Sequence, residues 1–179
     1  MPRPTARSAV ASWRADVLLW FVGPSVLVVW AVFGSPAADY RLVAVGSLIP
    51  LVELPLGGPR LFHSLTGAAL VLLAVMAGAR GHRRVQRRLL ALPIGMLLHL
   101  VLDGAWADTH AFWWPFLGTE WSTAELPELG RGPALTVLFE LVGLGACAWG
   151  YRRFRLGEPE RRVLFLETGR VGRDITPPR

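Results

Sequence analysis

The stretch that decides the fold is Leu89-Leu-Ala-Leu-Pro-Ile-Gly-Met-Leu-Leu-His99-Leu-Val-Leu-Asp103-Gly-Ala105, an apolar run that contains one histidine and one aspartate. On an α-helix, residues four apart lie on one face, so these two side chains project in the same direction. An ionisable side chain inside a bilayer costs ~2.5–3.5 kcal/mol even on the mildest scale, so such groups face a bundle interior or a watery cavity. Imidazole and carboxylate are also ligands for zinc-type ions and acid–base groups.

The composition favours a membrane environment. Of the 179 residues, 53% are hydrophobic and only 18% are charged, and the mean hydropathy is +0.41. All 19 basic residues are arginines, and they cluster at the ends of apolar runs, as in inner-membrane proteins rather than nucleic-acid-binding domains. The single Cys147 lies in an apolar run, which excludes a disulfide framework within the chain.

Four apolar stretches predict an all-α, polytopic membrane helical bundle of about four transmembrane helices. For the first stretch, Val17–Phe33, the alternative interpretation is a cleaved signal peptide, because arginines precede the stretch and small residues follow it. We favour a retained helix, because the apolar core exceeds the usual ~7–15 residues. The four stretches are Val17–Phe33, Leu61–Ala79, Leu89–Ala105 and Ala134–Gly150.

A fifth apolar segment, Arg41–Glu53, is shorter than the others. As an α-helix it measures ~20 Å, whereas the hydrocarbon core of a bilayer is ~30 Å thick. We therefore expect a short re-entrant or interfacial helix rather than a span, although the sequence leaves both open. Prolines and glycines between Pro50 and Pro59 then predict a loop.

The distribution of arginines predicts the topology. Arginines precede the first span at Arg3, Arg7 and Arg14, fill the loop Arg80–Arg88 and follow the last span at Arg152–Arg155. The positive-inside rule puts all three groups in the cytoplasm. The expected organisation is a disordered cytoplasmic N-terminus (1–14), a transmembrane helical domain (15–155) and a cytoplasmic polar tail (156–179), in a bacterial inner membrane with both termini cytoplasmic. The tryptophan-rich loop Trp106–Gly132 and Arg41–Glu53 would then lie on the extracytoplasmic side.

With this topology, ligand-type side chains on three helices converge on the extracytoplasmic half of the bundle. His99 and Glu140 lie ~9 Å deep, and His63 and Asp103 lie ~3 Å from the ends of their helices. Glu53, at the end of the short segment, is near enough in sequence to join them.

Each candidate also has a structural interpretation. His63 precedes Ser64, a good N-cap residue, and His99 with Asp103 would also fit a hydrogen bond between helices. Glu140 has a possible ion-pair partner in Arg131. The remaining candidates are weaker: Asp108 and His110 lie in an aqueous-side loop, and His82 lies in an arginine run. No nucleophile-elbow, phosphate-loop or C-x-x-C motif is present.

The order of these motifs resembles a known family. Gly46-Ser-Leu-Ile-Pro50-Leu-Val-Glu53, His63-Ser64, Gly95-Met-Leu-Leu-His99-Leu-Val-Leu-Asp103 and Trp113-Trp-Pro115-Phe116 are similar to motifs of the predicted membrane-bound, metal-dependent hydrolases (YdjM-like), small bacterial inner-membrane proteins. The chain departs from the family pattern after Pro50, where Leu51 replaces an aspartate and a carboxylate follows only at Glu53. It also lacks the family's extra histidine or arginine before His63.

The resemblance implies a hydrolase in which His63, His99 and Asp103 are metal ligands or catalytic groups and Glu53 stands where the family has an aspartate. From the depth of the cluster we expect these three residues to bind one divalent metal, with zinc favoured, and Glu53 or Glu140 to be the fourth ligand or general base. The ion would activate water for attack on a phosphoester or ester of a lipid-like substrate from the extracytoplasmic side. The alternative is a non-catalytic membrane protein whose polar cluster is structural or binds a partner. A solute or proton pathway is less favoured, because four spans without internal repeats are unlike a transporter.

Overall fold

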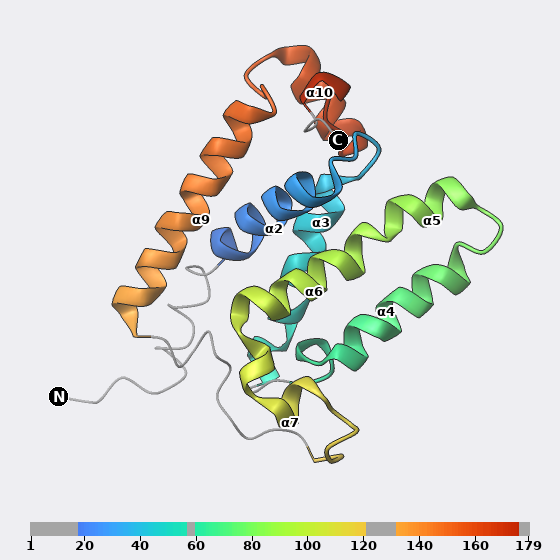
Figure 1. Ribbon diagram of the computed structural model, residues 1–179, viewed down its shortest axis with the longest axis vertical. Coiled ribbons are helices and arrows are strands. Elements are labelled where there is room, and N and C mark those ends of the chain that lie inside the picture. Colours follow the sequence, from blue (N-terminus) through green and yellow to red (C-terminus); the bar gives the residue numbers. More distant parts are fainter. Residues whose placement is uncertain (1–17, 57–59, 121–131, 176–179) are drawn as a thin grey trace.

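The computed structural model in Figure 1 describes residues 18–56, 60–120 and 132–175, and this part of the chain is helical without any strand. The all-α prediction is therefore confirmed for these residues, whereas the segment 1–14 lies outside them. The elements in chain order are α2 (Leu18–Phe33), α3 (Tyr40–Leu48), η1 (Ile49–Leu56), η2 (Leu61–His63), α4 (Leu65–Gly78), α5 (Arg83–Leu89), α6 (Ala91–Asp103), η3 (Ala105–Ala107), α7 (Thr109–Phe112), α9 (Pro133–Arg153), α10 (Pro159–Thr168) and η4 (Arg173–Ile175).

All four predicted apolar stretches form helices, but they differ in length. Two segments, Arg83–Asp103 and Pro133–Arg153, are long and apolar enough to cross a membrane. Leu18–Phe33 and Leu65–Gly78 are apolar but shorter. The count of four spans therefore stays a prediction, while the helical nature of each stretch is confirmed.

Helices α2 and α9 run parallel to each other. At the start of both, the Glu140 carboxylate accepts hydrogen bonds from the N–H groups of Leu19 and Trp20, at 3.2 and 3.1 Å. Further along both, the Trp30 and Trp149 rings meet edge to face with centroids 5.6 Å apart. Leu18 therefore lies at the opposite end of the bundle from Arg153. This differs from the predicted topology, in which the start of the first helix lies beside the C-terminal arginines.

We call the two ends of the bundle the arginine end and the site end, after the residues that lie there. The arginine end holds the α2–α3 turn, the start of α5 and the end of α9, and the site end holds the starts of α2, α4 and α9 and the end of α6. At the arginine end, Arg88 Nε lies 2.6 Å from Asp39 Oδ2. At the site end, the indole N–H of Trp20 donates to the Leu102 carbonyl at 3.3 Å.

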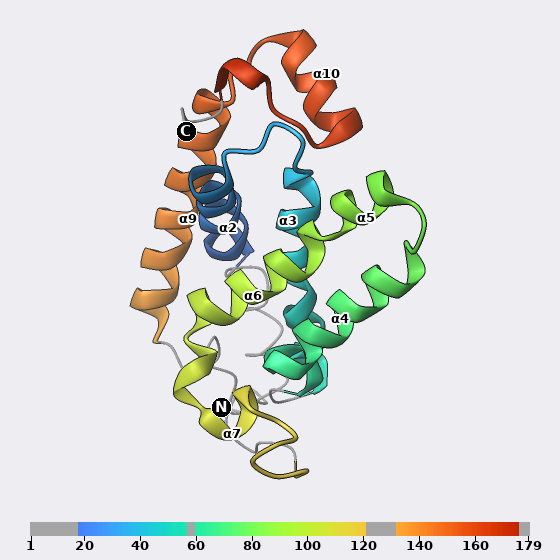
Figure 2. The ribbon, with the colours of Figure 1, turned by 45° about the vertical axis from the view of Figure 1, so that its right-hand side comes forward.

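The short segment Arg41–Glu53 runs from one end of the bundle to the other instead of lying at one end, and whether it spans or re-enters the membrane stays a prediction. Helix α3 begins at the arginine end beside Arg88, and η1 brings Glu53 to His63 at the site end, as Figure 2 shows for the path of α3. Residues 41–53 measure ~22 Å in this conformation, close to the expected ~20 Å, but the helical segment is longer because η1 continues to Leu56. Together α3 and η1 extend over ~30 Å, the thickness of a hydrocarbon core.

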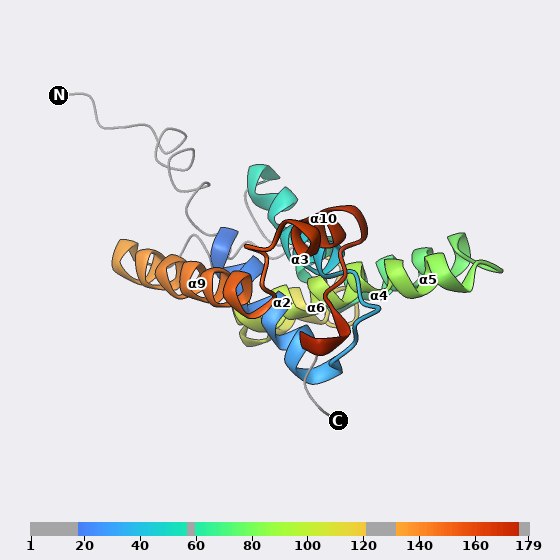
Figure 3. The same ribbon diagram turned by 90° about the horizontal axis from the view of Figure 1, so that it is seen from above.

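Close helix crossings at glycines hold the bundle together. A Cβ on Gly46 of α3 would lie 2.2 Å from the Leu92 carbonyl oxygen, and one on Gly95 of α6 would lie 2.2 Å from that of Val43. In the same way, a Cβ on Gly143 of α9 would lie 2.3 Å from the backbone of α2. Small residues at such crossings let membrane helices pack backbone to backbone. Seen from above, α9, α2, α6 and α4 follow one another across the molecule (Figure 3).

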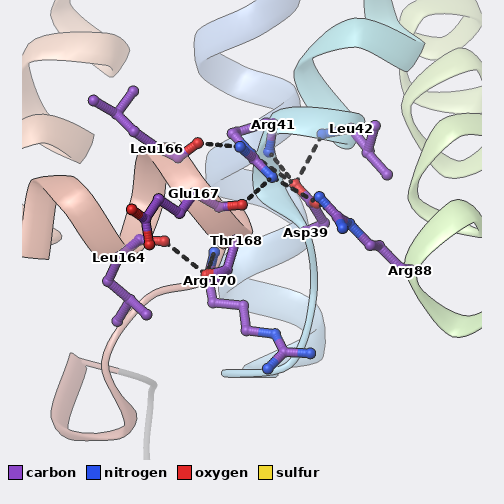
Figure 4. Close-up of polar contacts among 9 residues, drawn as sticks. All are labelled: Asp39, Arg41, Leu42, Arg88, Leu164, Leu166, Glu167, Thr168 and Arg170. Carbon is purple, nitrogen blue, oxygen red and sulfur yellow. Dashed lines mark hydrogen bonds and ion pairs between the residues drawn. The ribbon is translucent and has the colours of Figure 1, made fainter. Parts of the chain in front are cut away.

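The arginine end is organised around Asp39, which is 1% exposed and caps α3 (Figure 4). Its carboxylate receives hydrogen bonds from the guanidinium groups of Arg41 and Arg88. Arg41 also donates to the Leu166 and Glu167 carbonyls at the end of α10, so the C-terminal segment packs on this junction. Burial acts to raise the pKa of Asp39, but the hydrogen bonds from the two arginines lower it below its usual value.

Candidate metal centre

Three of the predicted site residues come together inside the bundle. His63 ends η2, whereas His99 and Asp103 lie one turn apart on α6. Each offers a ligand atom, and these atoms all lie within 4.8 Å of one another. The three residues are 1%, 0% and 4% exposed. Two imidazoles and a carboxylate held this closely in an apolar interior are suited to a divalent cation.

Glu53 is held behind His63 by a set of hydrogen bonds. Its Oε2 lies 2.8 Å from His63 Nδ1, and the carboxylate also accepts from the backbone N–H groups of Arg60 and Phe62, at 2.9 and 2.8 Å. An ionised carboxylate only accepts, so it favours the neutral tautomer of His63 that carries its proton on Nδ1. In that tautomer Nε2 is the nitrogen that can act as a metal ligand, as in carboxylate–histidine–metal triads.

His99 is held in the same tautomer by a different acceptor. Its Nδ1 lies 2.7 Å from the Ser47 carbonyl oxygen, and a carbonyl can only accept, so Nδ1 carries the proton. The Phe21 ring stacks on the imidazole with centroids 3.9 Å apart. The glycine crossing of α3 and α6 brings the Ser47 carbonyl this close, because a side chain on Gly95 would meet the backbone beside Ser47.

Local sequence fixes the backbone at the other two ligands. Ser64 caps α4 by accepting from the Gly67 N–H at 3.0 Å, which sets the chain direction immediately after His63. A Cβ on Gly67 would lie 2.0 Å from the Leu61 carbonyl oxygen, so η2 can fold back onto α4 only over a glycine. Helix α6 ends directly after Asp103, at Gly104 with φ of 75°, a conformation that glycine adopts without strain.

The other candidate residues lie outside the group formed by His63, His99 and Asp103. Glu140 caps the start of α2 and is not part of the group of three, while Arg131, its expected alternative partner, lies outside the described residues. Asp108 caps α7 through the N–H groups of His110 and Ala111. His110 and His82 are exposed. The structural interpretation of Asp108 and the expectation of a solvated His82 therefore agree with the structure.

Two supporting groups were missing from the sequence-based prediction. The Ser47 acceptor is a backbone carbonyl, which no residue type reveals, and Phe21 lies 78 positions before His99. The available signal for the Ser47 contact was a pair of glycines, Gly46 next to Ser47 and Gly95 one turn before His99, because small residues on two apolar helices indicate a close crossing.

Most of the chain also resembles a known protein family. The model of the YdjM inner membrane protein family matches residues 6–167. The chain belongs to this family. It is therefore an inner membrane protein, and the suspected YdjM-like resemblance is confirmed. Comparison with curated proteins and with solved structures gave no significant match.

The donor set of this YdjM family member fits a borderline metal ion. Imidazole nitrogen and carboxylate oxygen suit Zn²⁺ and its neighbours, whereas Ca²⁺ and Mg²⁺ prefer oxygen ligands alone. Three protein ligands are the number found in catalytic zinc sites, which keep one position open, while structural zinc sites generally have four. The hydrogen bonds to Glu53 and Ser47 supply the outer support that metal-ligating histidines require.

Proposed function

We propose that this inner membrane protein is a metal-dependent hydrolase that holds one divalent ion, with zinc favoured, through His63, His99 and Asp103. The observation that carries the proposal is the pair of histidines whose Nδ1 atoms are each fixed by an acceptor, Glu53 Oε2 and the Ser47 carbonyl, at 2.8 and 2.7 Å. Both rings thereby offer Nε2 as the ligand atom, within reach of Asp103.

Each residue has a distinct role in this proposal. A bound divalent ion supplies Lewis-acid chemistry, which polarises an ester or phosphoester and lowers the pKa of water. Asp103 supplies the negative charge among the ligands. Glu53 is assigned as a positioning residue that keeps the proton on His63 Nδ1, because its carboxylate already accepts three hydrogen bonds. Glu140 is assigned to capping α2 rather than to general-base catalysis.

The surroundings of the site end support a lipid-like ester or phosphoester as the substrate. Trp106 and Phe116, which follow α6, are 61% and 80% exposed, and such aromatic side chains settle at the membrane–water interface. The loop that carries them is fastened to α4 by the Thr66 hydroxyl, which donates to the Trp114 carbonyl at 2.5 Å. The proposed site therefore lies next to an interface at which a lipid ester group would be found.

One observation favours a second candidate, a non-catalytic protein in which the ion only joins η2 to α6. All three proposed ligands are almost fully buried, as expected for a closed site without an open position for substrate. In that case the ion would stabilise the fold and no substrate would reach it.

Metal analysis of the detergent-purified protein tests the site. We expect about one equivalent of zinc in the wild type and a loss of more than tenfold in His99→Ala and Asp103→Asn. The exposed histidines provide matched controls, because His82→Ala and His110→Ala should keep the wild-type content. Metal content that is low in the wild type and unaffected by His99→Ala would contradict the metal centre.

Turnover of ester and phosphoester lipid analogues in mixed micelles then separates the two candidates. The hydrolase predicts activity that is lost on chelation and restored by zinc. The structural alternative predicts that chelation lowers the midpoint of thermal unfolding while no lipid analogue is hydrolysed.

A further inference from the structure

A second feature of the bundle is a largely apolar cavity of about 310 Å³ that shares no residue with the histidine cluster. It lies between α2, α3, α9 and α10, and residues from all four helices line it, among them Val26, Ala44, Cys147 and Phe165. Nothing in the proposed metal chemistry uses this space. In a membrane protein, a cavity of this kind among the helices is accessible to the apolar parts of lipids.

The cavity is elongated along α9. It begins at Gly23 and Ala146, where α2 and α9 are in close contact because a Cβ on Gly23 would lie 2.6 Å from the Gly143 carbonyl oxygen. It continues to Phe154 at the arginine end, eight residues further, or ~12 Å along an α-helix. One leaflet of the hydrocarbon core is ~15 Å deep, so the cavity matches most of the depth that an acyl chain occupies.

The charge at the arginine end favours an anionic headgroup. Between Gly150 and Ile175 the chain has seven arginines against four acidic residues. Arg41 lines the cavity, and it shares the single carboxylate of Asp39 with Arg88, which leaves one positive charge in excess. Basic groups at this depth attract anionic lipids, by about 1 kcal/mol for each arginine near the surface.

We propose that the cavity binds one acyl chain of an anionic phospholipid, with the headgroup among the arginines at the arginine end. The lipid would fill the space between α2, α3, α9 and α10 and thereby join the C-terminal helix to the bundle. This proposal does not depend on the metal centre, because the two sites have no residue in common.

Photocrosslinking of the wild-type protein locates the lipid directly. The full-length protein in mild detergent is incubated with phosphatidylglycerol or phosphatidylcholine that carries a diazirine in the acyl chain, and crosslinked peptides are mapped. We expect saturable crosslinks at Val26, Ala44 and Cys147, with phosphatidylglycerol effective at a concentration at least tenfold lower. Crosslinks spread evenly over the outward positions Leu141 and Leu144 would mean annular lipid only and would overturn the proposal.

A matched pair of variants on α3 provides the second test. Ala44→Phe places a ring in the cavity, whereas Val45→Phe adds the same ring at a neighbouring position that is 52% exposed. Native mass spectrometry should show one tightly bound phosphatidylglycerol in the wild type and in Val45→Phe, and a loss of at least tenfold in binding to Ala44→Phe. Equal lipid retention by a folded Ala44→Phe protein, or equal binding of phosphatidylcholine, would contradict the proposal.

Discussion

Glu53 illustrates how a residue acts through another in this protein, because its carboxylate contacts His63 and two backbone N–H groups. Glu53→Gln keeps the shape but removes the charge that holds the proton on His63 Nδ1. We expect the affinity for zinc to fall about 10–100-fold, as for other supporting groups of metal-ligating histidines. Competition with a chromogenic chelator measures the change, and Glu120→Gln, at an exposed position, should leave the affinity unchanged.

Asp39 makes the stability of the arginine end depend on pH. The pKa of its carboxyl is lowered in the folded protein, so the stabilising contribution is present above the unfolded pKa of ~3.9 and is lost as the pH falls through the folded pKa. Asp39→Asn keeps an acceptor at the N-cap but loses both ion pairs. We expect it to cost about 1 kcal/mol at neutral pH, because both arginines are partly exposed.

The pH dependence provides the check on this prediction. Thermal unfolding in detergent between pH 3 and pH 7 should show a smaller decline at the acid end for Asp39→Asn than for the wild type. Parallel curves for the two proteins would show that Asp39 does not contribute in this way.

At the scale of the elements, the crossing of α3 and α6 connects packing to the metal site. In Gly95→Ala, the added methyl group would lie 2.2 Å from the Val43 carbonyl oxygen, so the two helices must separate. Overpacking of this kind costs about 1–3 kcal/mol, and it withdraws the Ser47 carbonyl from His99. We expect both a lower midpoint of thermal unfolding and weaker zinc binding.

Gly145→Ala is the matched control for that crossing. A Cβ on Gly145 of α9 meets no atom within 4 Å, and alanine favours a helix over glycine. This variant should be as stable as the wild type and bind zinc equally well. A similar loss in both variants would mean that helix crossing is not the cause.

For the whole molecule, the direction of the helices predicts a topology. Residues 37 and 84 lie towards the arginine end, and residue 110 follows α6 at the site end. In a Cys147→Ala background, single cysteines at Ala37 and Arg84 should be labelled from the cytoplasm, and one at His110 from the opposite side. Labelling of positions 37 and 84 from different sides would show that either α3 with η1 or α4 does not cross the bilayer, and would contradict this topology.

The sequence was sufficient for the parts of the site that depend on helical periodicity. His99 and Asp103 share a face because they are four residues apart, and His63 was predicted to lie near them because it lies at the start of the second apolar stretch. The contact of Glu53 with His63 joins residues ten positions apart, which helical periodicity does not predict, and the Ser47 contact depends on a helix crossing between backbones. The direction of α2 relative to α9 was predicted differently. The positive-inside rule considers only the positions of arginines, whereas the close contact of Gly143 with α2 depends on how the two helix surfaces fit together.

The proposed metal centre lies within the first 103 residues of the chain, and this has a consequence for biosynthesis. Its proposed ligands and supporting groups, from Phe21 to Asp103, all precede α9 and α10. During translation they leave the ribosome before the last long helix does, so an ion can be captured by a partly made chain. Helix α9 packs on α2, and α10 packs beside Arg41 at the arginine end, so neither supplies a ligand and the proposed ion could bind before they fold.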